Sequence, residues 1–219
     1  MVELLETADG SLTLRHEVLG ELYHSDRGAV GEAEHVYIRA GLDRALKERT
    51  AVSVFEVGFG TGLNGWLTCL RAQETGVKID YRAVDLYPVG MATVRRLNYT
   101  SDPVFMSLHD LPWDGAPHTV SEYFTLTKYE ADLLSFDFVS LNGRFDVVYF
   151  DAFAPDVQPE LWSEEVMRRM YAILGPGGAL TTYSAKGTVK RALRTAGFEV
   201  FRLPGALGKR HMLRAVKSL

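Results

Sequence analysis

The sequence has little cysteine, no long apolar run and no strong overall charge, and each shortage excludes a class of protein. The single cysteine, Cys69, rules out an internal disulfide and a cysteine-ligated metal site, and we expect it in the core. No apolar run reaches the length of a membrane span, and residues 1–6 lack the basic region of a signal peptide. We therefore expect a soluble, cytoplasmic protein that binds no metal.

Size and composition predict one well-packed core. The chain has 219 residues, 47% of them hydrophobic, which is enough for a single domain with a small elaboration. We expect an N-terminal hairpin and helix over residues 1–48, packed on a core domain over residues 49–219. No internal repeat or low-complexity segment divides the chain.

Charge is distributed unevenly along the chain. The net charge is −4, but the segment from Lys186 to Lys217 holds nine basic residues against Glu199 alone. That segment carries +8, so the rest of the chain carries −12. Such asymmetry is typical of a face that binds a polyanion, although a solvated helix and strand pair can also be basic. Composition alone leaves both explanations open.

A glycine-rich stretch over residues 54–64 follows a β-branched, apolar segment and precedes a helical pattern. A strand that breaks into such a turn brings free backbone N–H groups and a helix N-terminus to one spot. The sixth place of the dinucleotide fingerprint G-x-G-x-x-G is Leu63 here, so the pattern is G-x-G-x-G. It favours a nucleoside with an amino-acid tail over a pyrophosphate, although a structural turn can also hold three glycines. The candidate cofactor-binding residues here are Glu56, Gly58, Phe59, Gly60, Gly62 and Asn64.

Two acidic residues follow later strand candidates. Asp85 ends the strand 79–84, where a doubly wound sheet grips a ribose with a carboxylate; an ordinary strand-ending Asp is the alternative. Asp132 and Leu133 follow the strand candidate 119–128 and could contact an adenine. A helix-initiating Asp is the competing interpretation of Asp132.

The strand 145–150 is apolar on both faces, as a central parallel strand should be, and it leads into Asp151. This places Asp151 at the sheet edge where open α/β sheets bind ligands, and we count it among the cofactor contacts as well as the catalytic candidates. Phe153 and Pro155 add a stiff apolar wall.

The remaining elements complete the fold prediction. We expect a hairpin within 11–24, a helix over 31–47, and an irregular stretch over 100–118 with at most one short helix. His35 and Tyr37, near the start of the helix 31–47, could face a site, but a core or surface role is favoured for each. Helices are expected over 159–173 and 186–196, with strands over 179–184, 198–203 and 211–216. Two final strands without a helix between them form a hairpin. The pattern is typical of a Rossmann-like class I methyltransferase: seven strands, mostly parallel, with an antiparallel last strand.

Several motifs taken together resemble one family. They are Glu56–Asn64, Asp151–Pro155, Pro159–Trp162, Pro176–Gly187 and Gly208–Leu213, with Tyr23–Ser25 and Glu34–Ile38 near the N-terminus. The resemblance is to the methyltransferase domain of the tRNA 5-methylaminomethyl-2-thiouridine biosynthesis protein family, MnmC. It covers nearly the whole chain. One departure is His211, where the family usually has Glu.

The resemblance implies an enzyme that uses S-adenosyl-L-methionine to N-methylate 5-aminomethyl-(2-thio)uridine at the tRNA wobble position. Because no flavin oxidase domain follows, the chain is similar to the stand-alone form, MnmD, and a separate enzyme would supply the aminomethyl substrate. In this chemistry Asp151 could orient the amine and ease the loss of its proton, while Phe153 or Tyr183 excludes water. The candidate tRNA-binding residues are Phe153, Tyr183, Lys186, Lys190, Arg191, Lys209 and Arg210.

Two other functions fit parts of the pattern. A small-molecule amine methyl- or aminopropyltransferase of the spermidine synthase type shares the glycine turn and the acidic strand ends. It usually has a second Asp close after the first, whereas Asp156 here comes after a proline. A non-catalytic RNA-binding domain would bind no cofactor.

Overall fold

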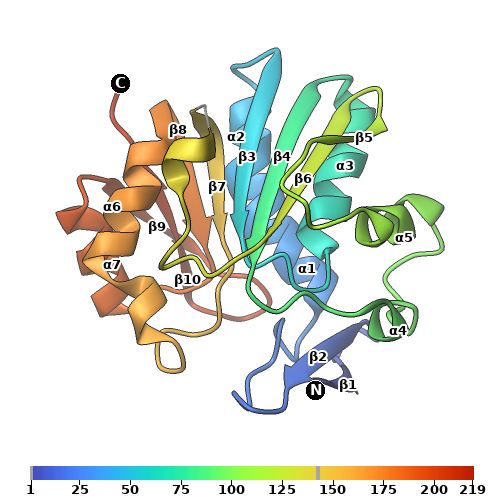
Figure 1. Cartoon of the computed structure of the whole chain (residues 1–219). Coiled ribbons are helices and arrows are strands. Elements are labelled where there is room, and N and C mark those ends of the chain that lie inside the picture. The colour runs from blue at the N-terminus through green and yellow to red at the C-terminus, as the bar shows by residue number, and fades with distance from the viewer. Residues whose placement is uncertain (1, 142–143) are drawn as a thin grey trace.

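An eight-stranded sheet forms the centre of the molecule in the computed structural model, which describes residues 2–141 and 144–219 (Figure 1). The strand order is β5-β6-β4-β3-β7-β8-β10-β9, and the five strands from β6 to β8 run parallel. Strand β10 is antiparallel to both neighbours, as expected of a class I methyltransferase fold. The strands are β3 (Ala51–Val57), β4 (Lys78–Asp85), β5 (His118–Ser121), β6 (Phe124–Glu130), β7 (Phe145–Phe150), β8 (Leu174–Thr182), β9 (Glu199–Pro204) and β10 (His211–Val216).

The eighth strand is a difference from the sequence prediction. The segment 119–128 was expected to be one strand, but a turn at Glu122 and Tyr123 divides it into β5 and β6, which pair antiparallel. Strand β5 therefore adds an antiparallel edge beside β6 and leaves the order of the other strands unchanged.

Helices cover both faces of the sheet. One face carries α1 (Ala29–Ala33), the π-helix η1 (Glu34–Leu42), α2 (Asp43–Leu46) and α3 (Leu63–Thr75), with α4 (Met91–Val94) and α5 (Pro103–Asp110) beside them. The other face carries α6 (Glu164–Ile173) and α7 (Gly187–Thr195), with the 3-10 turns η2 (Phe138–Leu141) and η3 (Pro159–Trp162) (Figure 1).

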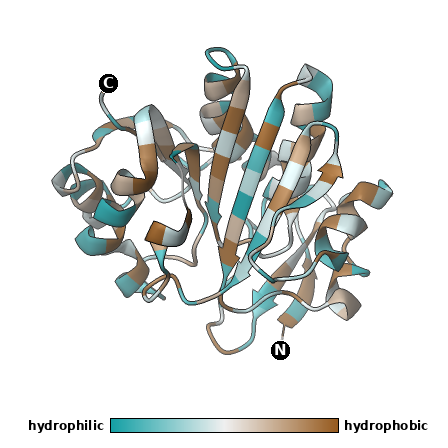
Figure 2. Ribbon diagram, turned by 45° about the horizontal axis from the view of Figure 1, so that its top comes forward, coloured by the Kyte–Doolittle hydropathy of each residue, from teal (hydrophilic) through white to brown (hydrophobic). Residues whose placement is uncertain are grey.

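Strand β7 shows how the sequence produces two cores. Val147 and Tyr149 face the core under η1 and α3, whereas Val148 and Phe150 face the core under α6 and α7. All four side chains are fully buried. Hydrophobic residues accordingly follow the central strands in Figure 2. The prediction of a central parallel strand here is confirmed.

Two predicted boundaries are wrong. The expected helix 159–173 is broken, because η3 ends at Trp162 and the hydroxyl of Ser163 then caps α6 by accepting from the N–H of Val166. The glycines at 175, 177 and 178 were expected in a loop, but β8 already begins at Leu174 and runs through them with a shift of register against β7.

The N-terminal hairpin lies at the end of the sheet where the parallel strands terminate (Figure 1). It pairs β1 (Val2–Glu6) with β2 (Leu12–His16), so only its second strand falls within the range 11–24 that the sequence indicated. The chain then turns back, and the N–H of Tyr23 donates to the carbonyl of Leu14. No helix among the described residues is both long and apolar enough to cross a bilayer.

Candidate functional site

A cavity of about 720 Å³ opens at the carboxyl ends of β3, β4, β6 and β7. This is the edge where open α/β sheets bind ligands, and the size suits a nucleoside with a tail. The strand ends form one wall, and residues 20–26 of the N-terminal segment, with Glu32 and Lys209, contribute to the other.

The glycine turn after β3 has a backbone that other residues rarely adopt. Gly58, Gly60 and Gly62 have φ angles of 85°, 51° and 71°. A Cβ on Gly58 would lie 2.6 Å from the backbone oxygen of Asp151, so glycine lets β3 and β7 approach closely. Gly58, Phe59 and Gly60 line the cavity. Gly62 does not: it lies just before α3 and packs under the His109 ring, and its contact with a cofactor stays a prediction.

Asp85 both lines the cavity and fixes the glycine turn. Its carboxylate oxygens accept from the N–H groups of Gly60 at 2.9 Å and Tyr87 at 2.8 Å. Burial raises the pKa of Asp85 above its usual range. Because each oxygen has a further lone pair, the two interpretations of this residue, turn and ligand contact, are compatible.

Asp132 and Leu133 also line the cavity, in a turn after β6. The Asp132 carboxylate accepts from the N–H of Leu134 at 2.9 Å, so it caps a turn rather than a helix. Leu133 is 5% exposed and presents an apolar surface beside it. The pair therefore lies where a ring and its exocyclic amino group could be held.

Asp151 follows β7 and is held from two sides. Its Oδ1 accepts from the hydroxyl of Tyr37 at 2.6 Å, and its Oδ2 accepts from the amide of Asn64 at 2.8 Å. Tyr37 belongs to the π-helix η1, a conformation found frequently at functional sites. Burial is the main cause that raises the pKa of Asp151 to about 7, and the carboxyl group lines the cavity.

Glu56 lies behind this group and does not line the cavity, and its direct contact with a cofactor stays a prediction. It is fully buried on β3, and its Oε1 accepts from the same Asn64 amide at 2.9 Å. Burial raises the pKa of Glu56 to about 8. Glu56 therefore fixes Asn64, which in turn fixes Asp151.

Aromatic residues form the wall next to Asp151. The ring of Phe153 lies 5.1 Å from that of Tyr23 and 5.7 Å from that of His16, between centroids. The hydroxyl of Tyr183 donates to the carbonyl of Ala152 at 2.9 Å. Both rings named from the sequence, Phe153 and Tyr183, line the cavity.

The cations of the basic segment 186–217 lie on several different elements. Of the predicted RNA-binding cations only Lys209 lines the cavity. Lys186 precedes α7 and pairs with Asp156, Lys190 and Arg191 lie on α7, and Arg210 lies in the β9–β10 turn. Elsewhere, Lys217 donates to two backbone carbonyls at the end of α6 and the start of β8.

Sequence reasoning missed part of the N-terminal wall. His24, Glu32 and the hydroxyl of Tyr37 were not predicted to contribute, and the contact of Tyr37 with Asp151 depends on how η1 packs across the sheet. The sequence signal for this region was that the segments Tyr23–Ser25 and Glu34–Ile38 resemble those of the family. Among the residues described, no group of three or more His, Cys, Asp or Glu side chains is placed to hold a metal ion.

Comparison with known proteins gives a consistent picture. Residues 119–218 match a family described as S-adenosyl-L-methionine-dependent methyltransferase. The chain is 30% identical over 214 residues to the tRNA 5-methylaminomethyl-2-thiouridine biosynthesis bifunctional protein MnmC of Azoarcus, covering 89% of this chain and 32% of that protein. The MnmC protein of Burkholderia multivorans is also 30% identical, with 92% and 33% covered. The chain thus spans about a third of the length of these curated relatives.

Solved structures share the fold. The MnmC2 structure from Aquifex aeolicus superimposes with a TM-score of 0.80 at 24% identity, covering 99% of this chain and 70% of that chain. DesVI of Streptomyces venezuelae gives a TM-score of 0.50 at 15% identity, with 86% and 92% covered. At these sequence identities the two solved structures show a shared fold and do not identify a substrate.

Proposed function

We propose that this chain, whose residues 119–218 match the S-adenosyl-L-methionine-dependent methyltransferase family and which is similar to the MnmC proteins, N-methylates the 5-aminomethyl group of (2-thio)uridine at the wobble position of tRNA. The observation that carries the proposal is Asp151, a carboxyl group held by Tyr37 and Asn64 at the edge of a nucleoside-sized cavity. The printed relatives are bifunctional, and the proposal concerns only the methylation step.

The residues of the cavity fit the cofactor. Gly58 and Gly60 line the cavity and carry no side chains, so a bound amino-acid tail could approach the backbone there. Asp85 would accept from the ribose hydroxyls, and Asp132 with Leu133 would hold the adenine. When bound, S-adenosylmethionine supplies a methyl carbon on a sulfonium, and the sulfur keeps the electron pair of the bond that breaks.

The role of Asp151 follows from its environment. An alkylamine is mostly protonated at neutral pH and must lose a proton before its nitrogen can bond to a methyl carbon. A carboxylate whose pKa is raised to about 7 can accept that proton, and its oxygens retain lone pairs beyond those bonded to Tyr37 and Asn64. Such acid–base assistance contributes about 10²- to 10⁴-fold in rate.

Recognition of tRNA would use the basic surface of α7. Lys186, Arg191 and Arg194 are exposed, and the positive charges of Arg194 and Arg202 lower the pKa of Lys190. A cluster of like charges is stabilised by an anionic partner, and RNA phosphates would supply one. The helix begins four residues after Tyr183, which belongs to the aromatic wall.

One experiment tests the function directly. Transfer RNA from cells unable to methylate this uridine would be incubated with the protein and isotopically labelled cofactor, digested, and analysed by nucleoside mass spectrometry. We expect the label in 5-methylaminomethyl-(2-thio)uridine. Label elsewhere, or turnover of putrescine with the decarboxylated cofactor in place of tRNA methylation, would contradict the proposal.

A further inference from the structure

A second carboxylate, Glu32, lies in the cavity wall besides Asp151. Glu32 lies on α1, its side chain is only 9% exposed, and it lines the same cavity. Its Oε2 accepts from the N–H of Ser25 at 2.8 Å, which fixes the direction of the carboxylate. A buried charge is costly unless it is paired, so this position needs a cation.

The cation is the ammonium group of Lys209, which reaches in from the β9–β10 turn. Its Nζ lies 2.5 Å from Oε1 of Glu32 and 5.2 Å from the centre of the Tyr183 ring. A carboxylate together with an aromatic face is the environment that favours an alkylammonium ion. The Tyr183 hydroxyl bonds to the carbonyl of Ala152, directly after Asp151, so the ring is fixed beside the proposed base.

The charges around Asp151 place Glu32 and Lys209 close to the same point. Glu32 raises the pKa of Asp151, whereas Lys209 lowers it. His24, the nearby imidazole, is neutral because burial lowers its pKa to about 4. If the Lys209 ammonium left, Glu32 would lose the cation that pairs with it, and the two carboxyl groups would attract the protonated amine of a substrate.

We propose that Glu32 and the Tyr183 ring form an ammonium-binding subsite for the substrate amine, which the Lys209 ammonium occupies in the free protein and leaves when the substrate enters. The inference rests on the proposed function, because it assumes an alkylamine substrate. It makes Glu32 a specificity residue that holds the amine beside Asp151, and Lys209 a cation that the substrate displaces.

A purely structural role for the Glu32–Lys209 ion pair would lead to a different experimental result. The β9–β10 turn is also joined to the N-terminal segment by Arg27, which donates to the carbonyl of Leu207 at 3.0 Å, and by a bond of 2.8 Å between His35 and the carbonyl of Pro204. If the ion pair served only as a third contact between the β9–β10 turn and the N-terminal segment, removing either Glu32 or Lys209 would have the same effect on amine recognition. The ammonium subsite instead predicts that loss of Glu32 weakens amine recognition, whereas loss of Lys209 does not.

The test compares two anticodon stem-loop RNAs that differ only in the aminomethyl group, with S-adenosylhomocysteine present. The measured quantity is the ratio of their dissociation constants, which cancels contacts to phosphate. We expect the wild type to prefer the aminomethyl RNA, Glu32→Gln to reduce the ratio about tenfold towards unity, and Lys209→Met to preserve or raise it. Equal reductions in Glu32→Gln and Lys209→Met, or an unchanged ratio in Glu32→Gln, would overturn the inference.

Three controls keep the result interpretable. Glu34→Gln removes a carboxylate two residues along that pairs with Arg39 and Arg71, and it should leave the ratio unchanged. If Glu32→Gln does not fold, Tyr183→Leu and Tyr183→Phe test the ring without breaking the ion pair: Leu should lower the ratio and Phe should keep it. A wild-type ratio of one, with no methyl transfer, would instead reject the proposed function, and the subsite with it.

Discussion

Asp151 and Glu56 are two carboxyl groups joined through a single amide, that of Asn64, which donates to both. Burial raises both pKa values, to about 7 and about 8 respectively. Perturbed carboxyl groups that share a partner are typical of sites where protons move. Tyr37 completes the group by donating to Asp151 from the opposite side.

Replacing Asp151 separates chemistry from cofactor binding. We expect Asp151→Asn to reduce methyl transfer by about 10²- to 10⁴-fold, because an amide cannot accept the proton of the amine. Binding of S-adenosylhomocysteine, measured by calorimetry, should change little. Asp137→Asn, an exposed change outside the cavity, serves as the control. Unchanged turnover in Asp151→Asn would remove this carboxylate from the reaction.

The pH dependence of the reaction follows from the same carboxyl group. A base with a pKa of about 7 is active only when ionised, so kcat/KM should rise with pH through that value. The hydrogen bond from Tyr37 lowers the pKa of Asp151, so Tyr37→Phe should move this rise to higher pH. A profile that does not move would mean that another group governs the acidic limb.

The sequence predicts the place of a site residue where that residue follows a strand. It does not predict the place of a residue on a helix that crosses the sheet. Asp85 and Asp151 follow apolar strands, so their place at the ligand edge follows from the sequence. No pattern in the sequence aims the Tyr37 hydroxyl at Asp151, since that contact needs a π-helix whose Gly41 packs against Val147 and Thr181.

At the scale of elements, the turn after β3 is the most constrained. Gly58 combines a φ of 85° with a close approach to Asp151, whereas Gly76, at the end of α3, has a φ of 66° and open space around its Cβ position. We expect Gly76→Ala to lower the free energy of unfolding by about 1 kcal/mol. Gly58→Ala should lower it by more than about 2 kcal/mol and abolish S-adenosylhomocysteine binding. Urea denaturation of both variants provides the comparison, and equal losses would contradict it.

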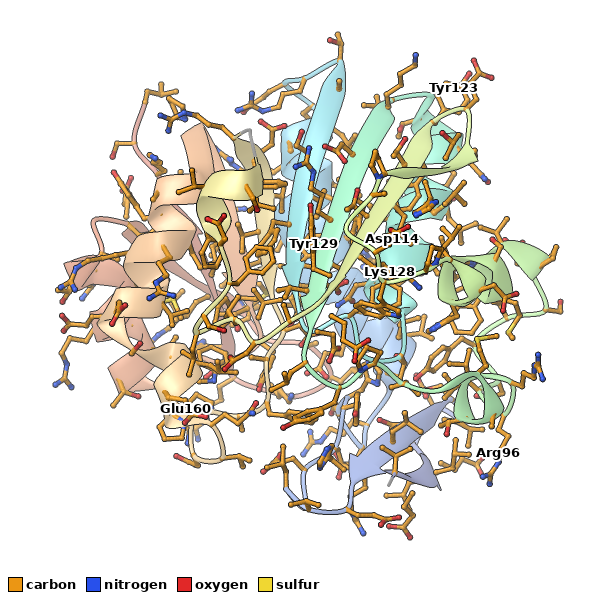
Figure 3. The ribbon with its side chains drawn as sticks, viewed as in Figure 1. Arg96, Asp114, Tyr123, Lys128, Tyr129 and Glu160 are labelled. Carbon is orange, nitrogen blue, oxygen red and sulfur yellow. The ribbon has the colours of Figure 1, made fainter. Side chains whose placement is uncertain are left out.

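Strand β6 is joined to α5 by a buried lysine. Lys128, labelled in Figure 3, donates to the carbonyls of Leu108 and His109, the last residues before the end of α5, and its Nζ lies 4.8 Å from the centre of the Trp113 ring. Burial lowers the pKa of Lys128 to about 8. The folded protein therefore loses this proton at lower pH than the unfolded chain does.

The direction in which the free energy of unfolding changes with pH can be measured. Between pH 8 and about 10.5 the unfolded state binds more protons at Lys128, so the free energy of unfolding should rise with pH across this window. Lys128→Met lacks the group and should not show the rise. We would compare urea midpoints of the two proteins from pH 7 to 10. Parallel curves would show that Lys128 does not titrate as its burial requires.

Element boundaries were predictable where turn residues mark them. The turn at Glu122 and Tyr123 contains no Gly, Pro or Asn, so the break between β5 and β6 left no mark in the sequence. The start of α6 did leave one: Ser163 followed by two glutamates is an N-cap pattern, and the preceding Pro159 obscured it.

At the scale of the whole molecule, the basic residues of the segment 186–217 fall into two groups. Some are exposed on α7, and others are paired with groups elsewhere in the protein. Lys190→Glu combined with Arg191→Glu should weaken tRNA binding at low salt and reduce the slope of log K against log salt by about two. Cofactor affinity should be unchanged. Lys47→Glu with Lys78→Glu makes the same charge change at the opposite end of the sheet and should leave the slope unaltered. If both pairs reduce binding equally, net charge and not α7 is responsible.

The cavity wall has a consequence for how the protein matures during translation. Glu32 and Lys209 meet although 177 positions separate them in the chain. While a ribosome is still adding residues, the β3–β7 half can collapse, but the last side chain of the pocket has yet to emerge. The substrate side of the cavity would therefore be completed in one late step, when the segments that carry Tyr183 and Lys209 join the rest of the sheet.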